Sequence, residues 1–211
     1  MGYFVHSEAG HNHKNEDVVA VQAHPKDAAI LLCALADGQG GQFGGAAASQ
    51  IAVEKCLELA STYSAKQLMD SSTWYEILSG ADDAVSDEQN AGYTTLIGLC
   101  VIDNKVCGAS CGDSAALLIN NGQHSLLTEK QRKNPPVGSA AASPVAFSAK
   151  LKQSFQILVM SDGVWKYVGW DAIIQLCSKQ QGQQLLSALR QLSLEQNGGK
   201  LPDDFSIALL Q

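Results

Sequence analysis

The chain has 211 residues, of which 45% are hydrophobic and 17% charged, so it is long enough to bury a sizeable core. Its net charge of −7 excludes the basic surface that binding to nucleic acid or to an anionic membrane requires. We therefore expect one domain over residues 1–211 that acts as a monomer, without nucleic-acid or membrane partners.

Runs rich in Val, Ile and Leu, which favour β-structure, predict strands in both halves of the chain. In chain order they are Asp17–Gln22, Ala29–Ala36, Thr94–Ile102, Lys105–Ser110, Ala115–Ile119, Phe155–Met160 and Phe205–Leu210. Apolar residues at helical spacing predict helices at Gly45–Thr62, Ala65–Asp87 (interrupted only at Gly80), Trp170–Lys179 and Gly182–Asn197. The proline-containing stretch Thr128–Ser148 predicts an irregular surface loop.

The order of these elements is typical of an α+β fold. Strands and helices do not alternate one for one, which disfavours a doubly wound parallel sheet. Helices instead come in two pairs, one between the early and middle strands and one before the last strand. We therefore expect antiparallel sheets that are covered by helix pairs.

The six cysteines form no Cys-x-x-Cys pair and lie mostly in apolar runs. We interpret them as core thiols in a reducing cytosol, with a bridge between Cys107 and Cys111 as the minor alternative. The first ten residues lack the features of a signal peptide, and no apolar run is long enough to span a bilayer. These features favour a cytoplasmic location.

Acidic residues recur where predicted strands meet turns. They are Glu16 and Asp17 before the first strand, Asp37 after the second, Asp113 between two strands, Asp162 after another, and Asp203 and Asp204 before the last. One aspartate at such a junction commonly caps local amides. Several along the whole chain instead favour a site for Mg²⁺ or Mn²⁺, which prefer carboxylate and carbonyl oxygens. Asp82 and Asp83, within a predicted helix, are interpreted as a solvated face.

Six short motifs resemble the metal-dependent protein phosphatases of the type 2C family and occur in that family's order. They are Asn15–Glu16–Asp17, Asp37–Gly38–Gln39–Gly40–Gly41, Thr94–Thr95–Leu96, Gly112–Asp113–Ser114, Ser161–Asp162–Gly163 and Asp203–Asp204. The resemblance implies a four-layer αββα sandwich of two antiparallel sheets flanked by helix pairs. It also implies hydrolysis of phosphoserine and phosphothreonine in proteins by a water activated on two Mn²⁺ or Mg²⁺ ions.

The resemblance also assigns the metal ligands. Asp37 resembles the carboxylate that bridges both ions, and Gly38 the residue whose carbonyl binds one of them. Asp162 and Asp203 resemble the remaining ligands of the other ion. Asp113, together with Asp162, resembles the pair that binds a weaker third ion.

Two further acids complete the implied site. Glu16 resembles an acid that holds metal-bound water, and Asp17 its neighbour behind it. The expected catalytic residues are therefore Asp37, Glu16 and Asp162. Trp165, Lys166 and Trp170 follow the Asp162 motif closely, and we interpret them as packing of that loop and helix rather than as substrate contacts.

Three departures from the family pattern concern substrate binding. Asn12 stands where the family usually has a phosphate-binding arginine, and Ala115 stands where it often has another. Lys14, His11 or His13 could substitute for the lost charge. The stretch Thr128–Ser148 is shorter than the flap of many bacterial members. These departures leave two alternatives open: a catalytically weak phosphatase-like binding or regulatory module, and a phosphatase for small phosphate esters.

Overall fold

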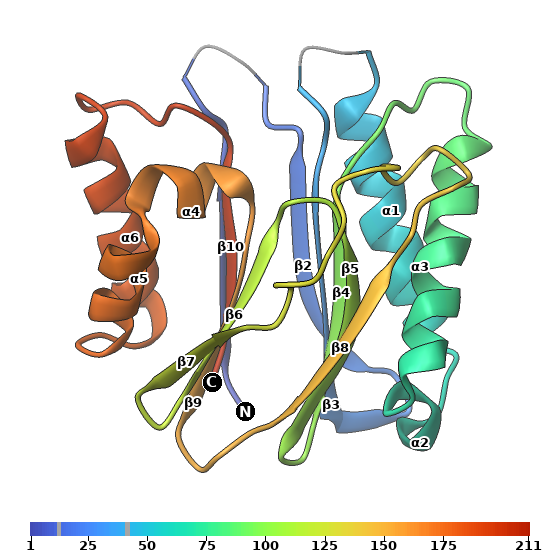
Figure 1. Cartoon of the computed structure of the whole chain (residues 1–211), viewed down its shortest axis with the longest axis horizontal. Coiled ribbons are helices and arrows are strands. Elements are labelled where there is room, and N and C mark those ends of the chain that lie inside the picture. Colours follow the sequence, from blue (N-terminus) through green and yellow to red (C-terminus); the bar gives the residue numbers. More distant parts are fainter. Residues whose placement is uncertain (12–13, 41–42) are drawn as a thin grey trace.

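The computed structural model describes residues 1–11, 14–40 and 43–211. Its strands form two five-stranded sheets, and all the pairings between named strands are antiparallel. Figure 1 shows the two sheets side by side at the centre, with helices on the outer side of each. The predicted α+β class and four-layer αββα sandwich are confirmed.

The first sheet is built from both ends of the chain. Its order is β1 (Tyr3–Glu8), β10 (Phe205–Leu210), β9 (Phe155–Met160), β6 (Ala115–Asn120) and β7 (Gln123–Leu126). The first and last strands are therefore direct neighbours. The outer face of this sheet is covered by α4 (Asp162–Val168), α5 (Trp170–Cys177) and α6 (Gly182–Gln196).

The second sheet has the order β2 (Asp17–His24), β3 (Asp27–Asp37), β4 (Leu96–Ile102), β5 (Lys105–Cys111) and β8 (Val145–Lys150). The helices α1 (Gly45–Ala60), α2 (Ala65–Leu68) and α3 (Ser71–Ser86) lie on its side of the sandwich, as Figure 1 shows. Among the helices that the structure describes, none combines the length and the apolar character needed to span a bilayer.

Strand β3 shows how the apolar sequence fixes the layers. Leu31 and Leu35 pack between the two sheets, whereas Leu32 and Ala34 pack against the helices on the outer face. Successive side chains of a strand point to opposite faces, so a strand between two apolar layers needs an uninterrupted apolar run. The run Ile30–Ala36 meets this requirement and is buried throughout.

The structure differs from the sequence prediction in several short elements. Strands β1 and β7 and helix α4 were not predicted, and β8 lies partly inside the predicted loop Thr128–Ser148. The predicted helix Ala65–Asp87 is two helices, because Asp70 caps the start of α3 by accepting a hydrogen bond from the Ser72 amide. Gly80, the expected interruption, lies within α3.

All six cysteines are free and buried, so Cys107 and Cys111 form no bridge.

Several strands begin or end at the same edge of the sandwich. β2 begins there at Asp17 and β3 ends there at Asp37, and the two residues are direct partners in the register. β9 ends and β10 begins at this edge too, at the top of Figure 1. The acid-rich strand ends of both sheets therefore meet in one region.

Candidate metal centre

One cavity of about 690 Å³ at this edge is lined by acids from separate parts of the chain. The predicted ligands Glu16, Asp37, Gly38, Asp113, Asp162 and Asp203 all contribute to its lining. Lys14 lines it too, whereas Asn12 lies outside the described residues. That these residues hold metal ions stays a prediction.

The backbone of Asp37 is fixed by two neighbouring threonines. Its amide donates a hydrogen bond to Thr95 Oγ1 at 3.0 Å, and its carbonyl accepts from the Thr95 amide at 2.9 Å and from Thr94 Oγ1 at 2.8 Å. Thr94–Thr95 precedes β4, the strand next to β3. These bonds fix the backbone of Asp37, whose side chain lines the cavity.

Gly38 allows two segments to approach each other closely beneath the cavity. A Cβ atom on Gly38 would overlap the carbonyl of Gly45 and lie 2.7 Å from the carbonyl oxygen of Glu16. The Gly38 amide donates to that same Glu16 carbonyl at 3.1 Å. Only glycine fits here, because any side chain would push Glu16 and the start of α1 away from Asp37.

Asp17 lies buried behind Asp37, and its carboxyl group has little support. Neither oxygen accepts a hydrogen bond of ordinary geometry, and the nearby hydroxyls of Ser161 and Ser206 only partly offset its burial. Burial, together with the charges of neighbouring acids, raises the pKa of Asp17 to about 7. Two carboxyl groups directly opposite each other in a sheet are ordinarily destabilising.

The same causes act more strongly on Asp37. Burial, followed by the charges of Asp17 and Asp162, raises the pKa of Asp37 to about 9. The ionised form of this carboxyl therefore needs a compensating positive charge. The donor set of carboxylates plus the Gly38 carbonyl is the oxygen chemistry that Mg²⁺ and Mn²⁺ prefer, so the residues present fit such ions.

Two lysines pair with acids of the cavity. Lys133 Nζ lies 2.5 Å from Asp113 Oδ2, and Lys166 Nζ lies 2.6 Å from Asp162 Oδ2. In the described parts of the chain, no three His, Cys, Asp or Glu side chains are drawn together as a finished metal-ligating cluster. We therefore expect that the ligand geometry is not preformed and that the carboxylates rotate toward an incoming ion.

Asp204 is a site residue whose role the sequence did not reveal. It is 5% exposed and accepts hydrogen bonds from the Gly10 amide at 2.8 Å and from the Glu16 amide at 2.6 Å. Asp204 thus ties the segment before β2 to the start of β10 and positions Glu16. The available signal in the sequence was an acid beside the start of an apolar strand, but the neighbouring Asp203 has the same sequence context.

Replacing these neighbouring acids by alanine is expected to separate a structural from a metal-related role. Asp204→Ala leaves two amides without their charged acceptor and should lower the free energy of unfolding by about 3 kcal/mol. Asp203→Ala should cost less stability but weaken Mn²⁺ binding. Urea unfolding and calorimetric Mn²⁺ titration of both variants check this; equal stability losses would contradict the assignment.

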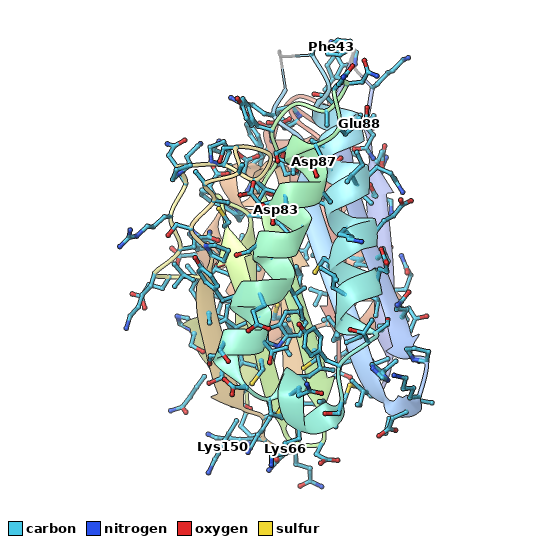
Figure 2. The ribbon with its side chains drawn as sticks, turned by 90° about the vertical axis from the view of Figure 1, so that its right-hand side faces the viewer. Phe43, Lys66, Asp83, Asp87, Glu88 and Lys150 are labelled. Carbon is cyan, nitrogen blue, oxygen red and sulfur yellow. The ribbon has the colours of Figure 1, made fainter. Side chains whose placement is uncertain are left out.

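Two interpretations from the sequence meet different outcomes. Asp83 is exposed on the outer side of α3, as Figure 2 shows, but Asp82 is only 3% exposed, so the solvated-face interpretation was wrong for Asp82. The packing interpretation of Trp165 and Trp170 agrees with the structure. Their rings stack at 5.5 Å, and Trp165 Nε1 donates to the Asp113 carbonyl at 3.1 Å.

Comparison with known proteins gives a family for the chain. Residues 6–197 match the family model described as protein phosphatase 2C. No curated protein sequence gives a significant match.

Solved structures share the fold over nearly the whole chain. A bacterial serine phosphatase with an arginine-to-alanine substitution superposes with a TM-score of 0.85 at 22% identity, covering 99% of this chain and 97% of its own. The catalytic domain of the serine/threonine phosphatase PstP, which is also solved from Mycobacterium tuberculosis, gives a TM-score of 0.80 at 21% identity in complex with two manganese ions, covering 99% of this chain and 96% of its own. The Staphylococcus aureus serine/threonine phosphatase Stp1 gives 0.78 at 20% identity, covering 98% and 93%.

Proposed function

This chain belongs to the protein phosphatase 2C family, and we propose that its acid-lined cavity is the active site of a metal-dependent phosphoprotein phosphatase. The enzyme hydrolyses phosphoserine and phosphothreonine in proteins and uses Mn²⁺ or Mg²⁺. The observation that carries the assignment of the site is the convergence of acids from both sheets on one cavity. The two manganese ions of the PstP catalytic domain, which has the same fold, support a centre of two ions.

Within this proposal, each carboxylate of the cavity has a role in metal binding. Asp37 and the Gly38 carbonyl would hold the ions together with Asp162 and Asp203, and Asp113 with Asp162 would offer a weaker further position. Bound ions would supply an activated water as the nucleophile for phosphoryl transfer.

Other residues of the chain orient these groups and the substrate. The amide of Glu16 donates to Asp204, and the carboxylate of Glu16 would accept a hydrogen bond from the attacking water. Asp17 adds negative charge behind Asp37, which strengthens the attraction for divalent cations. Lys14 and Asn12 remain the residues proposed from the sequence to contact the phosphate.

Phosphate release by the full chain tests the proposal. With Mn²⁺, the protein should dephosphorylate a phosphoserine peptide and p-nitrophenyl phosphate, and chelation with EDTA should abolish both reactions. Adding Mn²⁺ back should restore them. A protein that binds Mn²⁺ in calorimetry but releases no phosphate would instead support the phosphatase-like binding module.

We further propose that residues 1–211 work as one catalytic domain and as a monomer in the cytoplasm. The pairing of β1 with β10 supports one domain, since the first sheet is incomplete without either end. Six buried cysteines without disulfide bonds suit a reducing compartment. The net charge of −7 and the acidic cavity disfavour nucleic acid as a partner.

A further inference from the structure

The active-site cavity contains few positive charges for a substrate that carries two negative ones. Among the described residues that line it, the cationic side chains are Lys14 and Lys133, whereas the acids are Glu16, Asp37, Asp113, Asp162, Asp203 and Asp204. The metal ions of the proposed centre would attract a phosphate group, but the surrounding acids repel it, so cationic side chains at the rim would strengthen its binding. Lys133 was not among the residues singled out in the sequence, because it lies in the stretch predicted as an irregular loop.

The backbone on both sides of Lys133 is fixed to the rim of the cavity. The Gly112 amide donates to the carbonyl of Arg132 at 2.9 Å. On the other side, Thr94 and Val137 exchange two backbone hydrogen bonds of 3.0 and 3.1 Å. Thr94 is the residue whose hydroxyl holds the Asp37 carbonyl, so the loop is attached directly to the metal centre.

Asp82 fastens the next part of the same loop to α3. Its carboxyl oxygens accept from the Gly138 amide at 2.6 Å and from the Ala142 amide at 2.9 Å. Because Asp82 is almost fully buried, these bonds are shielded from water. The segment that presents Lys133 is therefore held at both ends, although it contains no regular secondary structure.

The side chain of Lys133 is free to turn even though its backbone is fixed. It is 68% exposed, and its Nζ forms an ion pair with Asp113 Oδ2 at 2.5 Å. An ion pair this exposed contributes little to stability, so a stronger acceptor can replace it. A phosphate dianion is such an acceptor, and the flexible lysine stem allows the ammonium group to follow it.

We propose that Lys133 binds the phosphate group of the substrate, supplying from the rim the positive charge that Asn12 does not supply at the usual arginine position. Lys133 rests against Asp113 between turnovers and turns to the phosphate when the substrate enters. This role rests on the phosphatase activity proposed above, and it concerns substrate binding rather than attack on phosphorus.

Lys133→Ala, Lys133→Arg and Lys130→Ala in the full chain test this role. Lys130 is exposed on the same loop but does not line the cavity, so Lys130→Ala is the matched control. With Mg²⁺ and a phosphoserine peptide, Lys133→Ala should raise KM at least tenfold while kcat changes less than threefold. Lys133→Arg should keep KM near the wild-type value, and Lys130→Ala should change neither constant.

Calorimetric titration of inorganic phosphate into the Mg²⁺-loaded proteins gives a readout that needs no turnover. Lys133→Ala should bind phosphate at least tenfold more weakly than the wild type. Unchanged KM and phosphate affinity in Lys133→Ala would overturn the role of Lys133. A fall in Mg²⁺ affinity without a change in phosphate affinity would do the same. A wild-type protein without activity would contradict the proposed function, while the phosphate titration would still decide on Lys133.

Discussion

Asp37→Asn is expected to abolish turnover while leaving the protein folded. In the proposed metal centre an amide cannot supply the negative charge that the divalent ions would need from Asp37, so kcat with Mn²⁺ should fall at least about a thousandfold. Burial and neighbouring acids already favour the uncharged form of Asp37. Asparagine resembles that form in shape and charge, so the metal-free variant should unfold at the same temperature as the wild type or higher.

The loss of metal binding can be measured separately from the loss of turnover. At a Mn²⁺ concentration of 100 times its dissociation constant, the wild type should gain about 2.7 kcal/mol of stability. Asp37→Asn should gain almost none. Asp27→Asn is the matched control, because Asp27 is an exposed acid at the opposite end of β3. Wild-type turnover in Asp37→Asn would refute the role assigned to this carboxylate.

The metal-free protein is expected to lose stability as the pH rises from about 4 to about 9. The pKa values of Asp37 and Asp17 are raised from 3.8 to about 9 and about 7, so the folded state holds protons that the unfolded state releases. The stability that these two protons contribute is therefore fully present below the pKa of the unfolded state, and it is lost as the pH rises toward the pKa values of the folded state. Each such proton gives a slope of about 1.4 kcal/mol per pH unit.

Urea unfolding in EDTA across this interval measures the slope directly. Asp37→Asn should flatten it, because the variant has no proton to lose at that position. Mn²⁺ should reverse the dependence, since ligand deprotonation favours metal binding at higher pH. A stability that stays constant or increases with pH in the metal-free wild type would contradict the raised pKa values.

The strands that form the core could be predicted from local sequence, and the edges could not. β3 and β9 each contain a continuous apolar run that is closely followed by Asp-Gly, so both their location and their burial are evident. β8 has alternating exposure, follows Pro144 and is stabilised by pairing with β5, which lies far away in sequence. Only seven residues form α4, too few for a periodic signal.

In the candidate site too, some residues could be predicted from the local sequence, whereas others depend on contacts with distant segments. Asp37 and Asp162 stand out because a glycine follows each at the end of a buried strand. The tie between Asp204 and Glu16 depends on the register of the whole first sheet, so neighbouring acids with the same local context have different surroundings. The position of Lys133 depends on a loop whose Gly138 amide donates a hydrogen bond to Asp82. No local sequence pattern connects Asp82 with that loop.

The pairing of β1 with β10 has a consequence for folding. Among the described strands, β1 pairs with β10 alone, and the amide of Glu16 donates to the carboxyl group of Asp204, which lies 188 residues further along the chain. The backbone around Glu16 therefore reaches its folded position only after these distant segments have met, so we expect the acid-lined cavity to form late in folding.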